Sequence, residues 1–456
     1  MDAFRVIDNA PTTKFHRKLL IACCGGPFLD GYVLSLIGVA MLGFAEDIPA
    51  TPGQMGLIGA ASLIGIFFGA TLFGALTDRI GREKMYALDL TVLVASCALT
   101  AFITDAWQLI VLRFILGLAI GADYPIATSL LTEFTPAKRR GYMIGLSGLA
   151  WSLGAMTAFV VGFVMVSLSG GHDLWRWMLF SGAILGIIIV LMRRGIPESP
   201  RWLVGKGRVR EAEDVIRKVY GVDVDLSTAA VDSGSQRRSG LADLRMLVTG
   251  GYLKRTIMCG TLYFAQITPQ YALYTFGSLI LLTAGIKGED AGTLGELVIA
   301  ALFAIGVIPA LRLIETWGRR PMTVVPFALM AVALLGLGLW ADAPAWFVIA
   351  AFAFYALSSG GPSVLEWIYP NELFPTEVRA TAVGLAVGIS RIGAATGTYL
   401  LPIGISTIGL QATLLIGAAV TVLAFVICLA WAPETKGRSL AETSSLSTRT
   451  PDPSLV

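Results

Sequence analysis

Histidine is nearly absent from this chain, and its absence excludes whole classes of chemistry. Only His16 and His172 occur in 456 residues, which leaves almost no material for a zinc site or a histidine-based catalytic triad. The five cysteines all lie inside apolar runs, which favours small packing residues over disulfides or metal ligands. No glycine-rich loop ends in Lys-Ser or Lys-Thr, which excludes an ATP-driven pump within one chain. We therefore expect no metal, no cofactor and no enzymatic activity.

Charged residues are scarce as well. Asp, Glu, Lys and Arg make up 14% of the sequence, against about 25% in soluble domains. Apolar residues make up 55%, and the mean hydropathy is +0.74. A soluble fold cannot bury so much apolar surface, whereas a lipid bilayer accommodates it. The polar segment 1–17 and the length of the first apolar run predict that no signal peptide is cleaved.

Twelve apolar segments are long enough to cross a bilayer as helices, which takes about 20 residues each. They lie at 19–45, 53–76, 85–104, 107–133, 141–168, 175–193, 254–284, 293–314, 321–340, 344–371, 380–404 and 408–431. Most exceed the minimum length, which predicts tilted helices. The sequence therefore predicts an all-α membrane protein with twelve transmembrane helices, six on each side of one long polar segment.

The positions of lysine and arginine predict the orientation. All but four of the 34 basic residues fall on one side of this topology; Arg113 and Arg391 lie within spans, and Arg176 and Lys287 lie on the other side. Because cytoplasmic loops carry the excess of basic residues, both termini are predicted to be cytoplasmic. Short loops and the lack of an Asn-x-Ser/Thr sequon favour a bacterial cytoplasmic (inner) membrane.

Three motifs recur between the two sets of spans at nearly one spacing. GALTDRIGREK (74–84) matches ETWGRRP (315–321), EFTPAKRRG (133–141) matches ELFPTEVRA (372–380), and PESPRW (197–202) matches PETKGR (433–438). The recurrence predicts two pseudo-symmetric six-helix bundles with a substrate site between them near mid-membrane. We expect an N-terminal bundle (1–193), a cytoplasmic linker with short amphipathic helices (194–253), a C-terminal bundle (254–438) and a polar cytoplasmic tail (439–456).

The motifs resemble those of the major facilitator superfamily along essentially the whole chain. GALTDRIGREK resembles its second-loop signature, and Arg113-x3-Gly117 resembles its fourth-helix signature. PESPR and PETKG resemble the signatures that end the two halves of sugar porters. The segment Gly121-Ala-Asp123-Tyr-Pro125 resembles metabolite:proton symporters. The resemblance implies a secondary active transporter that works by alternating access.

The sugar-binding signature of helix 7 is largely missing. Where sugar porters carry Gln-Gln-x-x-Gly-x-Asn, this chain has Ala265-Gln266-Ile-Thr-Pro269-Gln270-Tyr271. The start of helix 1, Asp-Gly-Tyr at 30–32, instead resembles aromatic acid:proton symporters. The sequence therefore leaves open whether the solute is an organic acid or a sugar or polyol.

Charged residues inside the spans point most directly to a function, since each costs at least ~2.5–3.5 kcal/mol at the bilayer centre. At about 1.5 Å per residue, Asp30, Asp123 and Arg391 all fall near the middle of the membrane. A midplane carboxylate beside a cavity can carry a proton, so Asp30 and Asp123 are predicted to couple transport to protons. The resemblance implies that Arg113 takes part in proton release. The alternative is that each carboxylate forms a static ion pair between helices.

The predicted substrate contacts combine an aromatic face, amide groups and one cation. They are Gln266, Gln270 and Tyr271 in helix 7, Trp367 in helix 10 and Arg391 in helix 11. Such a set suits sugars, polyols and aromatic acids alike. Arg391 favours an anionic solute unless Asp30, Asp123 or Glu366 neutralises it. The alternative for the aromatic residues is ordinary helix or lipid packing.

Two charged clusters at the predicted cytoplasmic ends of the spans are interpreted as gating latches. They comprise Asp78, Arg79, Gly81, Arg82, Glu133 and Arg140 in the first half and Glu315, Arg319, Glu372 and Arg379 in the second. Ion pairs that exist in only one state can bias a two-state equilibrium. The alternative is that these residues only set the membrane topology.

The predicted function is the proton-coupled import of a small organic metabolite, with protons and the solute as partners and with the monomer as the working unit. Two alternatives remain open. One is proton-driven efflux of drugs or metabolites, although segment 141–168 lacks the proline that efflux antiporters carry in helix 5. The other is a membrane nutrient sensor that does not transport, although only a short polar tail follows Arg438.

Overall fold

The chain is all helical wherever the computed structural model describes regular secondary structure. The described residues are 13–80, 82–135, 137–169, 173–226, 240–249, 251–283, 291–340, 342–374, 376–436 and 443. In parts of these helices the backbone alone is described.

Each predicted span coincides with one helix, except the tenth, which is divided in two. The first six spans are α2 (Lys14–Asp47), α3 (Pro52–Ile80), α4 (Arg82–Leu99, followed by the 3-10 turn η1, Thr100–Phe102), α5 (Ala106–Phe134), α6 (Ala137–Ser169) and α7 (Trp175–Arg193). The last six are α12 (Leu253–Thr283), α13 (Ala291–Trp317), α14 (Pro321–Leu339), the pair α15 (Ala345–Ser358) and α16 (Gly360–Leu373), α17 (Thr376–Ile408) and α18 (Leu410–Trp431). Between the two sets lie α8 (Pro200–Gly205), α9 (Val209–Tyr220) and α11 (Gly240–Thr249).

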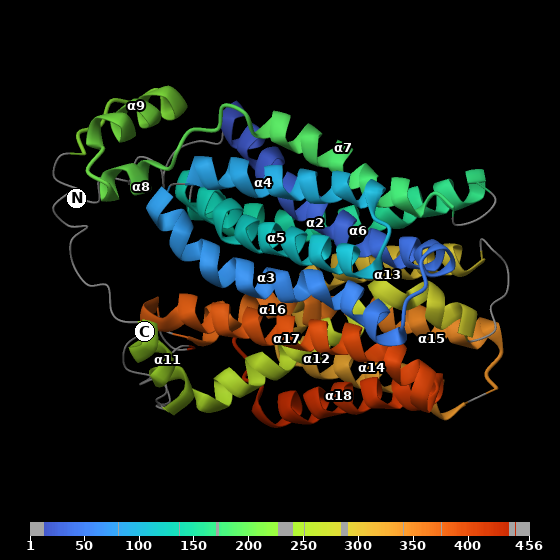
Figure 1. The fold of residues 1–456 in the computed structure, drawn as a ribbon. Coiled ribbons are helices and arrows are strands. Elements are labelled where there is room, and N and C mark those ends of the chain that lie inside the picture. The colour runs from blue at the N-terminus through green and yellow to red at the C-terminus, as the bar shows by residue number, and fades with distance from the viewer. Residues whose placement is uncertain are drawn as a thin grey trace, which may run out of the picture.

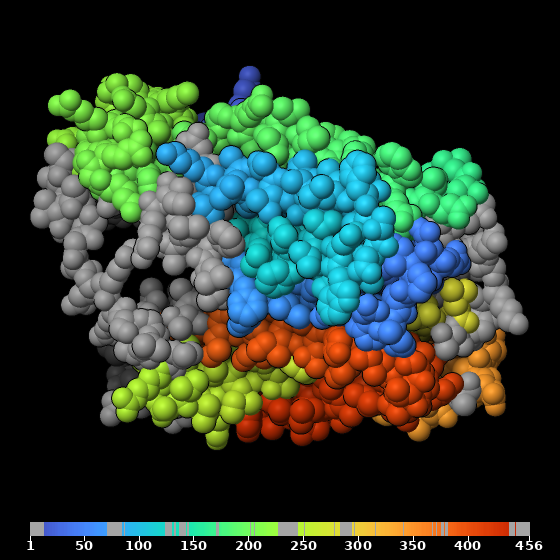
Figure 2. All heavy atoms as spheres, in the orientation of Figure 1, coloured from blue at the N-terminus to red at the C-terminus, as the bar shows by residue number. Residues whose placement is uncertain are grey.

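The long helices run side by side, and the three short helices α8, α9 and α11 lie at one end of the bundle (Figure 1). We call this end the linker end and the opposite end the far end. Figure 2 shows the blue-to-green helices of the N-terminal half and the orange-to-red helices of the C-terminal half meeting along one lengthwise boundary. By length and composition, nine helical segments among the described residues could cross a membrane.

Glycines let helices of the N-terminal half touch backbone to backbone. A Cβ atom added at Gly117 of α5 would lie 2.1 Å from the carbonyl oxygen of Ser62 in α3, and one added at Gly65 would lie 2.3 Å from that of Phe114. Apolar helices in lipid gain affinity for one another mainly through such close packing. The glycine of the Arg113-x3-Gly117 signature therefore has a packing role between α3 and α5.

Replacing Gly117 with alanine is expected to destabilise the protein by about 1–3 kcal/mol, the usual cost of overpacking a tight core. The matched control is Gly148→Ala on α6, where an added Cβ meets nothing within 4 Å. Thermal unfolding of both purified variants in detergent would measure the difference. Equal stability of the two variants would show that the close approach of α3 and α5 is not what the glycine provides.

Equivalent helix ends are capped in related ways in the two halves. In the N-terminal half, Nε2 of His16 lies 3.0 Å from the carbonyl oxygen of Phe134, at the end of α5. In the C-terminal half, Nη1 of Arg255 donates to the carbonyl oxygen of Leu373, at the end of α16, over 2.7 Å. The hydroxyl of Tyr220 also donates to Phe134 at 2.7 Å, which ties α9 to the N-terminal half. The internal repeat predicted from the sequence motifs is thus also present in the contacts that cap these two helix ends.

Candidate functional site

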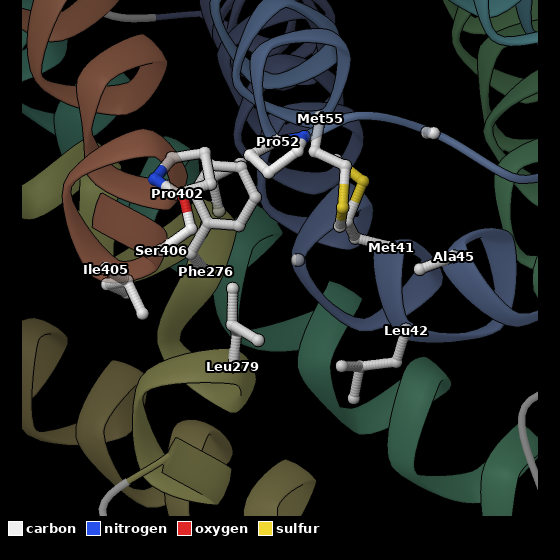
Figure 3. A pocket seen from close by; sticks show the side chains of 13 residues that line it. Met41, Leu42, Ala45, Pro52, Met55, Phe276, Leu279, Pro402, Ile405 and Ser406 are labelled. Atoms are coloured by element: carbon white, nitrogen blue, oxygen red, sulfur yellow. The ribbon is translucent and has the colours of Figure 1, made fainter. Parts of the chain in front are cut away.

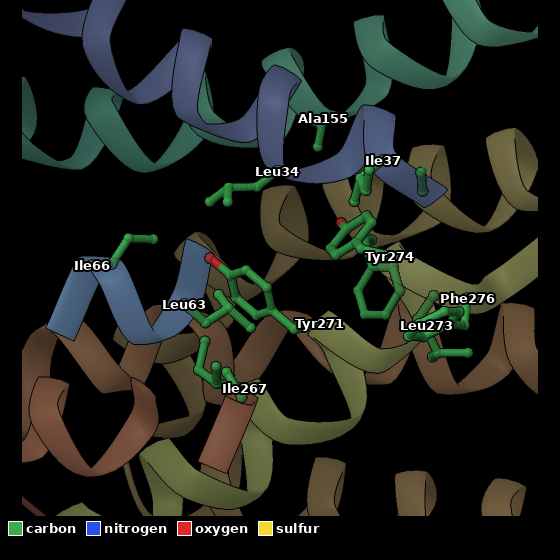
Figure 4. Packing of buried hydrophobic residues seen from close by; sticks show 14 of the residues in the cluster. Leu34, Ile37, Leu63, Ile66, Ala155, Ile267, Tyr271, Leu273, Tyr274 and Phe276 are labelled. Atoms are coloured by element: carbon green, nitrogen blue, oxygen red, sulfur yellow. The ribbon is translucent and has the colours of Figure 1, made fainter. Parts of the chain in front are cut away.

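The two halves meet where α2, α3 and α6 contact α12, α13 and α17. We call this contact surface the half boundary. Figure 4 shows Tyr271 and Tyr274 of α12 lying among Leu34, Ile37 and Leu63 of the N-terminal half. Of the predicted substrate residues of helix 7, Tyr271 is therefore at the half boundary, as expected for a site that both halves share.

Arg391 lies near the middle of α17 and reaches the half boundary. Its Nη1 atom donates to the hydroxyl of Tyr271 over 3.0 Å, and its guanidinium carbon is 5.7 Å from the centre of the Tyr271 ring. Two carboxyl groups interact electrostatically with it, those of Asp30 from α2 and Glu366 from α16. Arg391 therefore faces one acidic group from each half.

Aromatic side chains from both halves form a cluster beside Tyr271. The ring of Trp151 in α6 lies 5.9 Å from the ring of Tyr271 and 5.7 Å from that of Tyr274. Phe159 stacks on Tyr274 at 5.9 Å, and Phe303 of α13 approaches Tyr274 at 5.3 Å. Because Tyr274 follows Tyr271 toward the far end, this cluster lies on the far-end side of Tyr271.

Gln266 and Gln270 are both buried on α12. The amide nitrogen of Gln266 donates to the Ser363 hydroxyl over 2.8 Å and to the Ser359 carbonyl over 3.4 Å, at the break between α15 and α16. Its amide oxygen has no hydrogen-bond partner among the described residues. The side chain of Trp367, predicted to line the same site, lies outside the described part.

Asp30 occupies the middle of α2 and is only 1% exposed. Its Oδ2 atom has no hydrogen-bond partner among the described residues. The charged groups that interact with it are Asp89, Asp123 and Arg193 in the N-terminal half and Arg391 across the half boundary. The predicted midplane carboxylate is thus buried next to the site.

Asp123 lies inside the N-terminal half, where it forms an ion pair. Arg193 of α7 holds its carboxylate at 2.9 Å and also donates through Nε to the carbonyl oxygen of Ala22 over 3.3 Å. A Cβ atom at Gly26 of α2 would lie 1.8 Å from Oδ2 of Asp123 and 2.4 Å from Nη2 of Arg193. The pair fits only because residue 26 lacks a side chain.

Two residues of this region were missed in the sequence, Asp89 and Arg193. Asp89 is a buried carboxyl within the third span, and the reasoning that selected Asp30 and Asp123 applies to it equally. Arg193 is the last residue of the sixth span and reads as an ordinary cytoplasmic cation. Asp89 could have been identified as a site residue because it is a carboxylate within an apolar run of the sequence. Arg193 is identified as a site residue only by the packing of α7 against α2.

Arg113 is buried, but no described contact joins it to a carboxylate. Its Nη1 atom donates to the carbonyl oxygen of Val33 over 3.1 Å, and its Nη2 atom donates to the hydroxyl of Ser62 over 3.0 Å. These bonds connect α5 to α2 and α3. The structure therefore does not bring Arg113 to Asp30 or Asp123, and its proton-release role stays a prediction.

Of the predicted latches, Arg319 and Glu372 are brought together at the linker end. Nη2 of Arg319 lies 3.1 Å from Glu372, which also accepts a hydrogen bond from Thr435. The remaining latch side chains lie outside the described part: Asp78, Arg79, Gly81, Arg82, Glu133, Arg140, Glu315 and Arg379. The described pair links elements of one half, not of both.

Glu434 completes this cluster. Burial acts to raise the pKa of its carboxyl, but hydrogen bonds from the backbone N–H groups of Lys436, Arg319 and Arg320 hold the pKa below its usual value. Gly318 has φ of +101°, and a Cβ atom there would lie 2.5 Å from the Glu434 carboxylate. The repeated glycine of the loop signature therefore allows the turn and the approach of the acid.

Removing the Arg319 side chain is expected to destabilise the C-terminal half by about 1–3 kcal/mol, because Glu372 would lose its charged partner in a mostly buried site. The matched control is Arg208→Ala, whose ion pair with Glu211 is about half exposed and should change stability by at most about 0.5 kcal/mol. Thermal unfolding in detergent measures both. Equal shifts would show that the Arg319–Glu372 pair has no special structural role.

Among the described residues, we note two cavities that lie between the halves. One of about 280 Å³ opens near the far end and is lined by apolar side chains such as Met41, Met55 and Phe276 (Figure 3). The other, of about 440 Å³, lies between α3 and α17 and has Arg391 in its wall together with Phe67. The second is large enough for a small organic ligand and is the one with a cation.

These features define a multi-pass membrane transporter of the major facilitator fold: long apolar helices in two sets of six, with charged groups buried between and within them. The chain belongs to the sugar (and other) transporter family, whose family model matches residues 18–446. The members found are transporters and not enzymes, and the predicted twelve-helix, two-bundle fold is confirmed.

Relatives match over nearly the full length. The putative metabolite transport protein YaaU of Escherichia coli (strain K12) is 40% identical over 449 residues, which cover 98% of this chain and 99% of the relative. The arabinose-proton symporter of Bacillus subtilis (strain 168) is 29% identical over 456 residues, covering 96% and 97%. A partially occluded inward-open structure of the xylose transporter XylE from E. coli gives a TM-score of 0.78 at 19% identity, covering 94% of this chain and 100% of that one.

Proposed function

We propose that this chain is a proton-coupled symporter that imports a small organic metabolite bearing a carboxylate. The observation that carries the proposal is the position of Arg391. It lies in the wall of a cavity between the halves and interacts with Asp30 from one half and Glu366 from the other. A cation shared by two buried acids is a natural partner for an incoming anion when either acid is protonated.

Protonation of Asp30 would favour solute binding for an electrostatic reason. With Asp30 ionised, its charge offsets that of Arg391 and repels a solute carboxylate that approaches Arg391. With Asp30 protonated, the cation is available to the solute. Proton and solute then increase each other's affinity, and this increase is reciprocal by thermodynamic linkage. Because the two residues belong to different halves, their interaction also depends on whether the site is open or closed.

The other predicted contacts suit the rest of such a solute. Tyr271 presents a ring and a hydroxyl beside Arg391, and Gln266 has a buried amide oxygen without a described partner. We assign Gln270 and Trp367 to the same site from their positions on α12 and α16. A neutral sugar or polyol is the second candidate, because the relatives include an arabinose-proton symporter.

The transport cycle would rock the bundles 1–193 and 254–438 against each other about the half boundary, with 194–253 as a linker and 439–456 as a tail. Both termini would be cytoplasmic, in a bacterial inner membrane. The paired charged clusters at the linker end would stabilise one closed arrangement. One chain contains both halves of the site, so a monomer suffices.

Solute-driven proton movement tests this function. Protein in proteoliposomes that contain a pH-sensitive dye is challenged with organic acids, sugars and polyols, after a thermal-shift screen has selected binders. An organic acid should drive proton entry. If only a sugar or polyol does so, the anion assignment is wrong. If solutes exchange without any proton movement, proton coupling is wrong.

A further inference from the structure

The N-terminal half buries three carboxyl groups around one arginine. Asp30 of α2, Asp89 of α4 and Asp123 of α5 are 1%, 5% and 3% exposed, and Arg193 of α7 is 7% exposed. Asp30 and Asp89 interact electrostatically with both Asp123 and Arg193. Arg113, which is also buried in this half, donates to neutral groups instead. Among the described residues, Arg193 is therefore the cation that faces all three acids, and Asp30 also interacts with Arg391 across the half boundary.

This count limits how many of the acids can be ionised at once. The ion pair at 2.9 Å neutralises Asp123. Arg391 offsets a charge on Asp30 but is shared with Glu366, and among the described residues no cation other than Arg193 interacts with Asp89. Ionising Asp89 as well would leave an uncompensated charge in an apolar interior, at a cost of several kcal/mol. In this conformation Asp89 is therefore protonated.

The contacts of Asp89 indicate that its carboxyl group carries a proton. Oδ1 of Asp89 accepts the N–H of Leu90 at 2.6 Å, and Oδ2 is buried without a described donor. The carboxyl group of Asp89 interacts electrostatically with that of Asp123. Two ionised carboxylates that interact in this way repel each other, which favours a proton on one of them. Since Arg193 stabilises Asp123 as the anion, the proton is on Asp89.

We propose that Asp89 is a second proton-binding site of the transport cycle, and that the Asp123–Arg193 pair is its fixed counter-charge. This inference rests on the proposed proton coupling. Asp30 takes a proton from cavity water and passes it to the Asp89 carboxylate, after which Asp30 takes a second proton. Both are released as Asp89 and Asp30 ionise, the former to water at the linker end. Asp89 is suited to that release, since it lies about 10 Å along α4 from Arg82.

The proton-to-solute ratio tests the proposal. In proteoliposomes with the membrane potential clamped at zero, one finds the solute gradient that just balances a pH gradient of one unit. Two protons per solute balance a roughly 100-fold solute gradient, and one proton balances a roughly tenfold gradient, because each proton contributes about 1.4 kcal/mol per pH unit. Wild-type protein should balance near 100-fold and Asp89→Asn near tenfold. Asp214→Asn, an exposed acid on α9, should match wild type.

Glycine variants provide a second test, in which all the charged side chains are retained. Gly26→Ala would place a Cβ atom within 2.4 Å of both Asp123 and Arg193, whereas Gly25→Ala on the same helix contacts only the side chain of Ile189, at 3.1 Å. Only Gly26→Ala should shift the pH dependence of uptake. Equal balance points for wild type and Asp89→Asn would overturn the second proton site while leaving proton coupling intact. Absence of any solute-driven proton movement in wild type would overturn both the proposed function and this inference.

Discussion

Asp30→Asn is expected to abolish uphill accumulation of solute while leaving solute exchange intact. Asparagine keeps the shape of a protonated aspartate and its neutrality, so Arg391 stays available to the solute. The variant can neither release a proton nor pass one to Asp89, and it therefore loses the accumulation of roughly tenfold per pH unit that each coupled proton provides. Vesicle uptake under an imposed pH gradient measures accumulation, and counterflow without a gradient measures exchange.

The pH dependence of binding gives the same prediction a second readout. Protonating Asp30 removes a negative charge that competes for Arg391, so wild-type affinity for an anionic solute should rise as the pH falls. Asp30→Asn should bind with high affinity and without this dependence. Accumulation by the variant that an uncoupler collapses would show that Asp30 is not the proton carrier.

Asp123→Asn is the informative comparison for Asp30→Asn. Asp123 is paired with Arg193 inside the N-terminal half, so its neutralisation leaves a buried cation without its partner. Breaking such a pair typically costs about 3–5 kcal/mol. We therefore expect Asp123→Asn to lower the folded yield and exchange together, unlike Asp30→Asn.

The depth of the site residues could be predicted from the sequence, but the direction of their side chains could not. Helices surrounded by lipid and other helices are apolar all round, so periodicity does not reveal which face meets which neighbour. Arg113 and Asp123 illustrate this: they share α5, yet one bonds to Val33 and Ser62 and the other to Arg193. Pairing across helices is a property of the tertiary packing alone.

The break in the tenth span shows a similar limit. Proline within a transmembrane helix is often tolerated, so Pro362 did not by itself predict that α15 ends at Ser358. The break follows from packing: a Cβ atom at Gly360 would lie 2.1 Å from the carbonyl oxygen of Gly306 in α13. The Ser359 carbonyl at the break accepts from the N–H of Ser363 over 3.0 Å and also from Gln266.

Arg391→Lys is expected to weaken binding of an anionic solute by roughly 10–100-fold with little change in folded yield. Lysine keeps the charge that balances Asp30 and Glu366, but it lacks the planar fork that grips a carboxylate at two points. Losing one charge-assisted hydrogen bond costs about 1.5–3 kcal/mol, which sets the size of the effect. Titration of the purified variant against the solute found by thermal shift measures it.

Tyr271→Phe separates the two interactions of Arg391. It removes the hydroxyl that accepts from Nη1 at 3.0 Å but keeps the ring beside the guanidinium. If Arg391 binds the solute directly, the phenylalanine variant frees one donor and should bind the anion at least as well as wild type, while Arg391→Lys binds it worse. The opposite result is that a neutral sugar is the best ligand and that Arg391→Lys binds this sugar normally. Arg391 would then be a structural partner of Glu366, and the proposal that the solute bears a carboxylate would be wrong.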